Sequence, residues 1–183
     1  MKRAHLSFVL KLLIVLLLQI LVLNELFLWR YATPFAYPLL LFFFPIDTKK
    51  SVYTLTGGLV GLLIDAVSAT AGLHTAAFTA VSFLYGYLLP FFVVADADPS
   101  SLPSVQRDAS KPFVLLLLIL LLHHLILFSL DAIGSASIGY LALRMLCSLI
   151  SSYVIAMIVM LLSLIHISEP TRHLRISYAV FCL

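Results

Sequence analysis

Long apolar runs, separated by short polar stretches, follow one another along the whole chain. A helix that spans a membrane needs roughly 20 apolar residues, with a range of about 17–25. Five stretches meet this length and hold few charges: 6–29, 52–72, 74–95, 112–130 and 137–161. A further apolar stretch, residues 32–46, is short and contains three prolines. We expect it to be either a short, tilted span or a re-entrant element packed against its neighbours.

The pattern therefore predicts an all-α integral membrane protein, a six-transmembrane-helix bundle whose second span is short or tilted. Composition agrees, because 63% of the 183 residues are hydrophobic and only 10% are charged. Soluble domains are about half apolar and about a quarter charged. This excess of apolar residues excludes a soluble enzyme, a nucleic-acid-binding module and a disordered segment. The partner that it implies is the lipid bilayer.

The positive charges predict the orientation of the bundle, because Lys and Arg collect on the cytoplasmic side of a membrane. With six crossings and a cytoplasmic N-terminus, most of them share that side: Lys2, Arg3, Lys49, Lys50, Arg107 and Lys111. If residues 32–46 failed to cross, the lysine pair would face outward and the bias would be lost. We therefore expect six crossings, both termini in the cytoplasm, and a solvated loop over residues 96–111.

Polar residues recur at one depth inside the predicted spans. Asp65, His123 and Arg144 each lie roughly 10 Å below the expected outer surface, at about 1.5 Å per helical residue, and Asn24 lies slightly nearer that surface. Charges at such depth are usually buried, paired or functional. This layer is either a packing network or a site for a ligand or partner helix. Within it we expect Asp65 and Arg144 to pair, directly or through a neighbour such as His123.

The chain lacks the motifs that would indicate catalysis. It has no GxSxG, no HExxH, no phosphate-binding glycine loop and no paired-aspartate transferase motif. His123 and His124 are adjacent, whereas two metal ligands on one helix need a spacing of three or four residues. Cys147 and Cys182 form no CxxC pair. We therefore expect no enzyme activity, no metal and no cofactor.

The last residues differ in character from the rest. The apolar pattern stops at Ser168-Glu169-Pro170, and residues 162–183 resemble a translated sequencing adapter. We therefore divide the chain into a transmembrane domain, residues 1–161, and a non-native tail, residues 162–183. The native protein is expected to be truncated near residue 161, and the tail to carry no function.

Two stretches, 18–45 and 58–90, together resemble the rod shape-determining protein MreD family. The first has Asn24 near the outer end of a helix, followed by an aromatic and proline-rich approach to the next. The second is a glycine-rich helix that ends in an aspartate, followed by Thr, Gly and a His before small residues. The matching positions are Gly58, Gly61, Asp65, Thr70, Gly72 and His74.

The resemblance covers residues 1–161 and implies a non-enzymatic component of the bacterial cell-elongation complex. Such a protein supports peptidoglycan synthesis and cell shape from the inner membrane. Its implied partners are an MreC-like protein, MreB-like filaments and the RodA–transpeptidase synthase. The alternative from another class is a small-molecule-binding subunit of a vitamin-type transporter, which also has six short spans. A transporter pocket would need aromatic residues and hydrogen-bonding groups around an internal cavity.

Overall fold

The computed structural model describes residues 2–26, 28, 31–94, 97–104, 110–133 and 137–180, with side chains between residues 9 and 162. This part of the chain is all-α. In chain order its helices are α1 (Lys2–Leu18), the π-helical turn η1 (Gln19–Leu23), the 3₁₀ helix η2 (Tyr37–Phe43), α2 (Lys50–Ser68), α3 (Leu73–Phe92), α4 (Ser110–Asp131) and α5 (Ile138–Val180).

Four helices are long and apolar enough to cross a membrane: α2, α3, α4 and the Ile138–Leu162 part of α5. They match the predicted stretches 52–72, 74–95, 112–130 and 137–161, which confirms these four elements to within a few residues. A shorter apolar helix covers Val9–Leu23. The chain is thus a multi-pass membrane protein by the length and composition of its helices.

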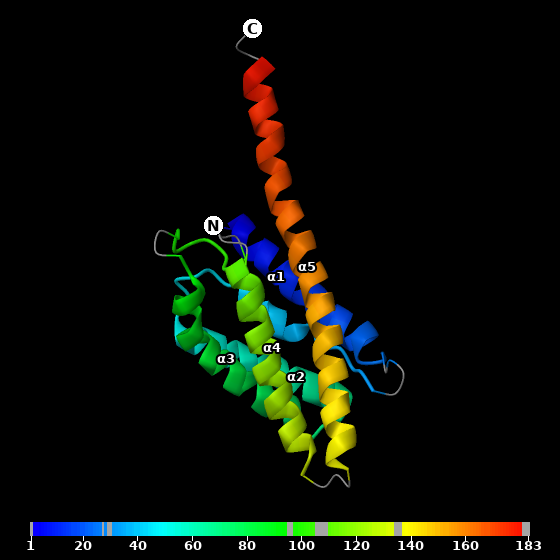
Figure 1. The fold of residues 1–183 in the computed structure, drawn as a ribbon. Coiled ribbons are helices and arrows are strands. Elements are labelled where there is room, and N and C mark those ends of the chain that lie inside the picture. Colours follow the sequence, from blue (N-terminus) through cyan, green and yellow to red (C-terminus); the bar gives the residue numbers. More distant parts are fainter. Residues whose placement is uncertain are drawn as a thin grey trace.

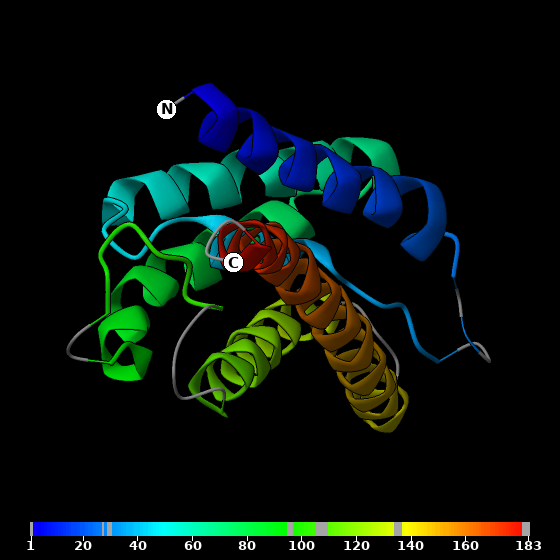
Figure 2. The ribbon, with the colours of Figure 1, turned by 90° about the horizontal axis from the view of Figure 1, so that it is seen from above.

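Two antiparallel pairs organise these helices. α2 and α3 pack along their length, α3 packs on α4, and α4 packs on α5 (Figure 1). Seen from above, α1 lies on the opposite side of the molecule from α4 and α5 (Figure 2). The C-terminal part of α5 continues as a helix through the adapter-like residues and projects beyond the other helices (Figure 1).

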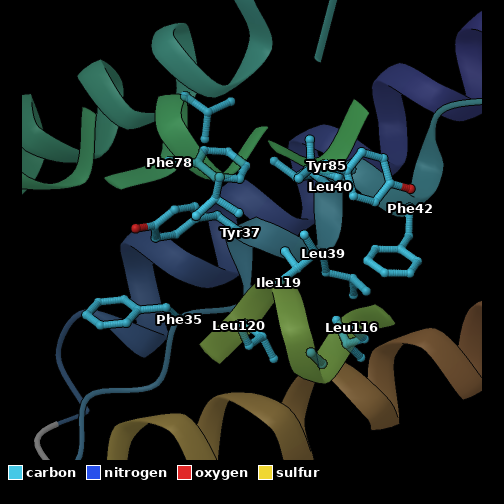
Figure 3. Packing of buried hydrophobic residues seen from close by; sticks show 14 of the residues in the cluster. Phe35, Tyr37, Leu39, Leu40, Phe42, Phe78, Tyr85, Leu116, Ile119 and Leu120 are labelled. Carbon is cyan, nitrogen blue, oxygen red and sulfur yellow. The ribbon is translucent and has the colours of Figure 1, made fainter. Parts of the chain in front are cut away.

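The centre of the bundle is η2. It lies within residues 32–46, for which the sequence allowed either a short, tilted span or a re-entrant element. All seven of its residues are buried, and Tyr37, Leu39, Leu41 and Phe42 have no exposed surface. A helix that is apolar on every side is stable only when protein or lipid surrounds it completely. Figure 3 shows Tyr37, Leu39 and Leu40 between side chains of α3 and α4, among them Phe78, Ile119 and Leu120.

The chain before η2 leaves helical geometry. After the π-type hydrogen bond from the Asn24 N–H to the Gln19 carbonyl (2.9 Å), the described residues as far as Ala36 form turns and irregular backbone. Backbone outside a helix has unpaired N–H and C=O groups, which are tolerated at membrane depth only where protein satisfies them. We call residues 31–36 the strap, and its hydrogen bonds form part of the candidate site.

Two loops join at the end of the bundle where α2 begins. The N–H groups of Ile46 and Asp47 donate to the carbonyls of Ser101 and Pro99, both at 3.0 Å. Asp98 organises its own turn by accepting hydrogen bonds from the amide and hydroxyl of Ser100 at 2.9 and 2.8 Å. These two hydrogen bonds favour the charged carboxylate and lower the pKa of Asp98. Of the predicted 96–111 loop, residues 97–104 are therefore ordered by turns and by the contact with residues 46–47, whereas Ser110 and Lys111 already belong to α4.

Candidate functional site

Asp65 is the cap of the following helix. Its Oδ1 accepts hydrogen bonds from the Thr70 hydroxyl and the His74 amide (3.0 Å), and its Oδ2 accepts from the amide and hydroxyl of Thr75 (2.8 and 2.6 Å). The first N–H groups of a helix lack intrahelical partners, and a carboxylate there also complements the helix dipole. The usual capping position of α3 is Gly72, which has no side chain. Asp65 supplies the missing acceptor from the end of α2.

The turn between α2 and α3 needs the residues that surround this cap. Ala69 and Gly72 both have left-handed backbone, with φ of 53° and 86°. Gly72 has open space where a Cβ would lie, so its positive φ is what favours glycine there. Gly61 is required by contact instead, because a Cβ on it would lie 2.6 Å from the Thr75 Cα and 2.8 Å from the His74 carbonyl oxygen. We call Asp65, Thr70, Gly72, His74 and Thr75 the hairpin cap.

This geometry corrects the prediction that Asp65 pairs with Arg144. The Asp65 carboxylate takes its four hydrogen bonds within the hairpin cap, whereas Arg144 Nη1 lies 3.6 Å from Asp131 Oδ2. The guanidinium also lies over the rings of Phe128 and Tyr140 at 5.5 and 5.8 Å. Similar depth in the membrane does not specify which face of a helix a side chain occupies. The Asp65 carboxylate therefore has its hydrogen-bond partners in nearby amide and hydroxyl groups and needs no cation.

His74 connects the hairpin cap to the core through Tyr37. The Tyr37 hydroxyl lies 2.9 Å from His74 Nδ1 and 2.6 Å from His123 Nε2, and all three side chains are buried. Within the described residues, His123 Nδ1 has no hydrogen-bond partner. A buried N–H without a partner is rarer than an acceptor without one. The arrangement that avoids it has His123 Nε2–H donating to Tyr37 and the Tyr37 hydroxyl donating to His74.

His124 continues the network on the other side of α4. Its Nδ1 lies 2.7 Å from the Leu120 carbonyl and its Nε2 lies 3.2 Å from the Ser152 hydroxyl. A carbonyl only accepts, so Nδ1 carries the proton, and Nε2 of the neutral ring accepts from Ser152. Of the two adjacent histidines, the polar layer expected from the sequence contained only His123. Both are buried and joined to it, because the 100° between them directs each to a different neighbour.

The strap is held by side chains from two distant helices. On α5, the Ser148 and Ser152 hydroxyls accept hydrogen bonds from the amides of Thr33 (3.0 Å) and Phe35 (2.7 Å). From η1, the Gln19 amide oxygen accepts from the Ala36 N–H at 2.7 Å. The Gln19 amide nitrogen lies 3.3 Å from the Pro34 carbonyl and 2.8 Å from Asn24 Oδ1.

Three of the four predicted layer residues thus join one connected set of contacts. Asn24 bonds to Gln19 and, at 3.0 Å, to Ser68 at the end of α2. Asp65 reaches His123 through His74 and Tyr37. Arg144 lies apart, beside Asp131. We call the connected set the buried polar network; its members are Gln19, Asn24, Tyr37, Asp65, His74, His123, His124, Ser148 and Ser152.

Sequence reasoning missed Gln19, Tyr37, Ser148 and Ser152. A signal was present for some of them: Gln19 is one of two amide side chains in the stretch 6–29, with Asn24, and the two serines are four residues apart on one helix face. Tyr37 carried no signal beyond its aromatic surroundings.

The network is closed by packing. The Phe35 ring centroid lies 5.3, 5.8 and 5.6 Å from those of His74, His123 and His124. In the described part of the chain, two surface hollows lie away from this network, one against the outer face of α2 and α3 and one beside residues 46–48. Comparison of the sequence with protein-family models and curated proteins, and of the fold with solved structures, finds no match.

Proposed function

We propose that this chain is a non-enzymatic membrane scaffold of the MreD type. In this role it binds an MreC-like protein and the RodA–transpeptidase pair in a bacterial inner membrane, close to MreB-like filaments. The observation that carries the proposal is the hairpin cap. Of the six positions on which the resemblance rests, five meet at this turn: Gly61, Asp65, Thr70, Gly72 and His74. The pattern therefore describes one structural device, the turn that joins α2 to α3.

The sixth position behaves differently. A Cβ on Gly58 would meet only the Thr79 hydroxyl, at 3.5 Å, which is an ordinary contact. Gly58 is therefore not needed to close the hairpin. It faces the outer hollow of α2 and α3, and a small residue there preserves that surface for contact with something outside the bundle.

The packed core supports a scaffold over the transporter-subunit alternative. A ligand-binding subunit needs a cavity lined by hydrogen-bonding groups. Members of the buried polar network instead bond to one another and to the strap, and Phe35 and Tyr37 occupy the space between the histidines. A protein filled in this way offers partners its helix faces and its short loops.

We propose six crossings, with residues 32–46 as the second. At one end of this segment, Tyr31 contacts Tyr140 near the start of α5; at the other, Ile46 and Asp47 bond to the loop after α3. Thr33 and Phe35 are two residues apart, whereas the serines that bind them are four residues apart on α5, which is about 6 Å along a helix. Two residues cover about 6 Å only when the backbone is extended, so the strap is extended between Thr33 and Phe35.

Extended backbone explains how so few residues could cross. Residues 32–35 at up to about 3.3 Å each, Ala36 in helical geometry at about 1.5 Å and the seven of η2 at about 2.0 Å each add to roughly 29 Å, close to the thickness of the hydrocarbon core. A reporter that is active only in the periplasm, fused after Lys50, should be silent. Activity of that reporter would refute this topology and place both lysines outside.

Complementation tests the function itself. In a rod-shaped bacterium depleted of its own MreD, the full chain should restore rods. A pull-down in mild detergent should recover the MreC-like and RodA-like proteins. Asp65→Ala should lose both results, and Asp131→Ala, which removes a carboxylate outside the hairpin cap, should keep them. Recovery of an ATPase module without the elongation proteins would support the transporter subunit and refute the scaffold.

A further inference from the structure

A groove of about 710 Å³ runs along the outer face of the α2–α3 hairpin. Its α2 wall contains three exposed leucines, Leu55, Leu59 and Leu62, and its α3 wall contains Phe83 and Tyr87. Between these walls the surface is formed by small residues, including Gly58 and Thr79. The walls are apolar and half or more of most of these side chains is exposed, so the groove faces the hydrocarbon of the bilayer.

A cation closes one end of this apolar groove. The stem of Lys50 packs on Gly86, where a Cβ would lie 3.0 Å from the Lys50 Cγ, and its Nζ lies 3.8 Å from the centroid of the Tyr87 ring. Among the described residues no carboxylate lies within ion-pairing distance of this ammonium, although Asp47 lines the smaller neighbouring hollow. The Ser51 hydroxyl lines the same end of the groove.

The length of the groove distinguishes its possible occupants. From Lys50 to Leu62 helix α2 rises about 18 Å, whereas one leaflet of the hydrocarbon core is about 15 Å thick. A transmembrane helix of a partner would pack along both leaflets, about 30 Å. The groove therefore matches an acyl chain that begins at the membrane surface near Lys50 and ends near the bilayer midplane.

We propose that this groove binds one anionic glycerophospholipid, with its phosphate at Lys50 and an acyl chain between Leu59 and Phe83. The charge of the groove mouth complements an anionic headgroup, and its walls complement hydrocarbon. By the distribution of Lys and Arg, Lys50 faces the cytoplasmic leaflet, where basic residues near the surface attract anionic lipids. The site does not depend on the rod-shape assignment, because it rests on the α2–α3 surface and on the proposed orientation of the helices.

Native mass spectrometry of the full chain, purified in mild detergent, tests the headgroup. Dioleoylphosphatidylglycerol and dioleoylphosphatidylcholine are added separately at equal concentration. Wild-type protein should bind one phosphatidylglycerol saturably and prefer it roughly five-fold, the preference expected of one lysine near the surface. Lys50→Gln should abolish the preference. Lys49→Gln, which removes the same charge from a residue outside the groove, should keep it.

A second pair of variants tests the acyl chain. Gly58→Leu fills the groove and should reduce binding of both lipids at least ten-fold, whereas Gly58→Ala should reduce it less. The unfolding temperature of each variant must not fall below that of the wild-type protein. Equal binding of both lipids by wild-type protein, or unchanged phosphatidylglycerol binding by Lys50→Gln or Gly58→Leu, refutes the proposal. A Gly58→Leu variant that loses a dimer and keeps its lipid would show that the groove holds a second copy, which also refutes it.

Discussion

The α2–α3 hairpin and the strap solve the same problem in opposite ways. Both present backbone groups outside regular helix to the interior of a membrane protein. The hairpin satisfies them locally, since the partners of Asp65 lie five to ten residues away in sequence. The strap satisfies them at long range, since the serines that bind Thr33 and Phe35 lie 115 and 117 residues away.

This difference indicates an order of dependence. The hairpin has its glycines and its cap within 57–75, so it can form as soon as α2 and α3 are in the membrane. The strap has its full set of hydrogen bonds only after α5 has packed against it. Changes in the strap should therefore affect the whole bundle, whereas changes in the hairpin should act first on one helix pair.

The largest effect is expected at Gln19. Gln19→Leu leaves the Ala36 N–H and the Pro34 carbonyl buried without this partner, at roughly 1–3 kcal/mol for each group. We expect a loss of about 3 kcal/mol, measured as a lower unfolding temperature in detergent. Leu21→Ala, on the exposed side of the same turn, is the control and should change little. Equal effects of the two variants would mean that the strap does not depend on Gln19.

Gly61 should come next. A methyl group there would meet backbone atoms of α3 at 2.6 and 2.8 Å, so the two helices must separate. Overpacking of this kind costs roughly 1–3 kcal/mol. We expect Gly61→Ala to lose about 2 kcal/mol in the same thermal assay. The matched Gly58→Ala should leave stability unchanged or slightly raised, because its new methyl group makes only an ordinary contact.

Substitution of Asp65 should lower the free energy of unfolding slightly less than Gly61→Ala, and it tests whether the carboxylate acts as a helix cap or as an ion-pair partner. Asp65→Ala removes the acceptor for two amides of α3, and loss of a helix cap costs roughly 0.5–2 kcal/mol. Asp65→Asn keeps one acceptor oxygen and should lose about half as much. Removal of Arg144 should not rescue Asp65→Ala, and the two losses should add in a double-mutant cycle. If removal of Arg144 did rescue Asp65→Ala, Asp65 and Arg144 would form an ion pair, which would contradict the hairpin cap.

The smallest effect is expected at single serines of α5. Ser152→Ala removes the acceptor for the Phe35 N–H and the donor to His124, and interhelical hydrogen bonds in membranes average about 0.6 kcal/mol. We expect a loss of about 1 kcal/mol. Ser151→Ala, whose hydroxyl bonds only within its own helix turn to Ser148, should lose less. In double-mutant cycles, the stability losses of Ser152→Ala and Gln19→Leu should be non-additive, whereas those of Ser152→Ala and Gly61→Ala should add. This result would show that the strap and the hairpin are separate units.

Much of the fold followed from patterns of apolar residues. The four long helices were predictable because each must cover about 30 Å of hydrocarbon with side chains that tolerate lipid. Asp65 was visible as a charge inside an apolar run, whereas Gly61 and Gly72 were marked only by the family resemblance. The structure supplied their reasons, a close helix contact at Gly61 and a positive φ at Gly72. The partner of Asp65 was not predictable from depth, since depth leaves the rotation of the helix undetermined.

The sequence by itself determined the class of protein, its long helices and some of the buried polar positions, among them Asp65 and His123. Only the tertiary structure decided the form of residues 31–44 and the members of the buried polar network. The physical reason is the range of the interactions. A helix is specified by residues that lie within a few positions of one another. The strap is specified by Gln19, Ser148 and Ser152, which become its neighbours only when the bundle has closed.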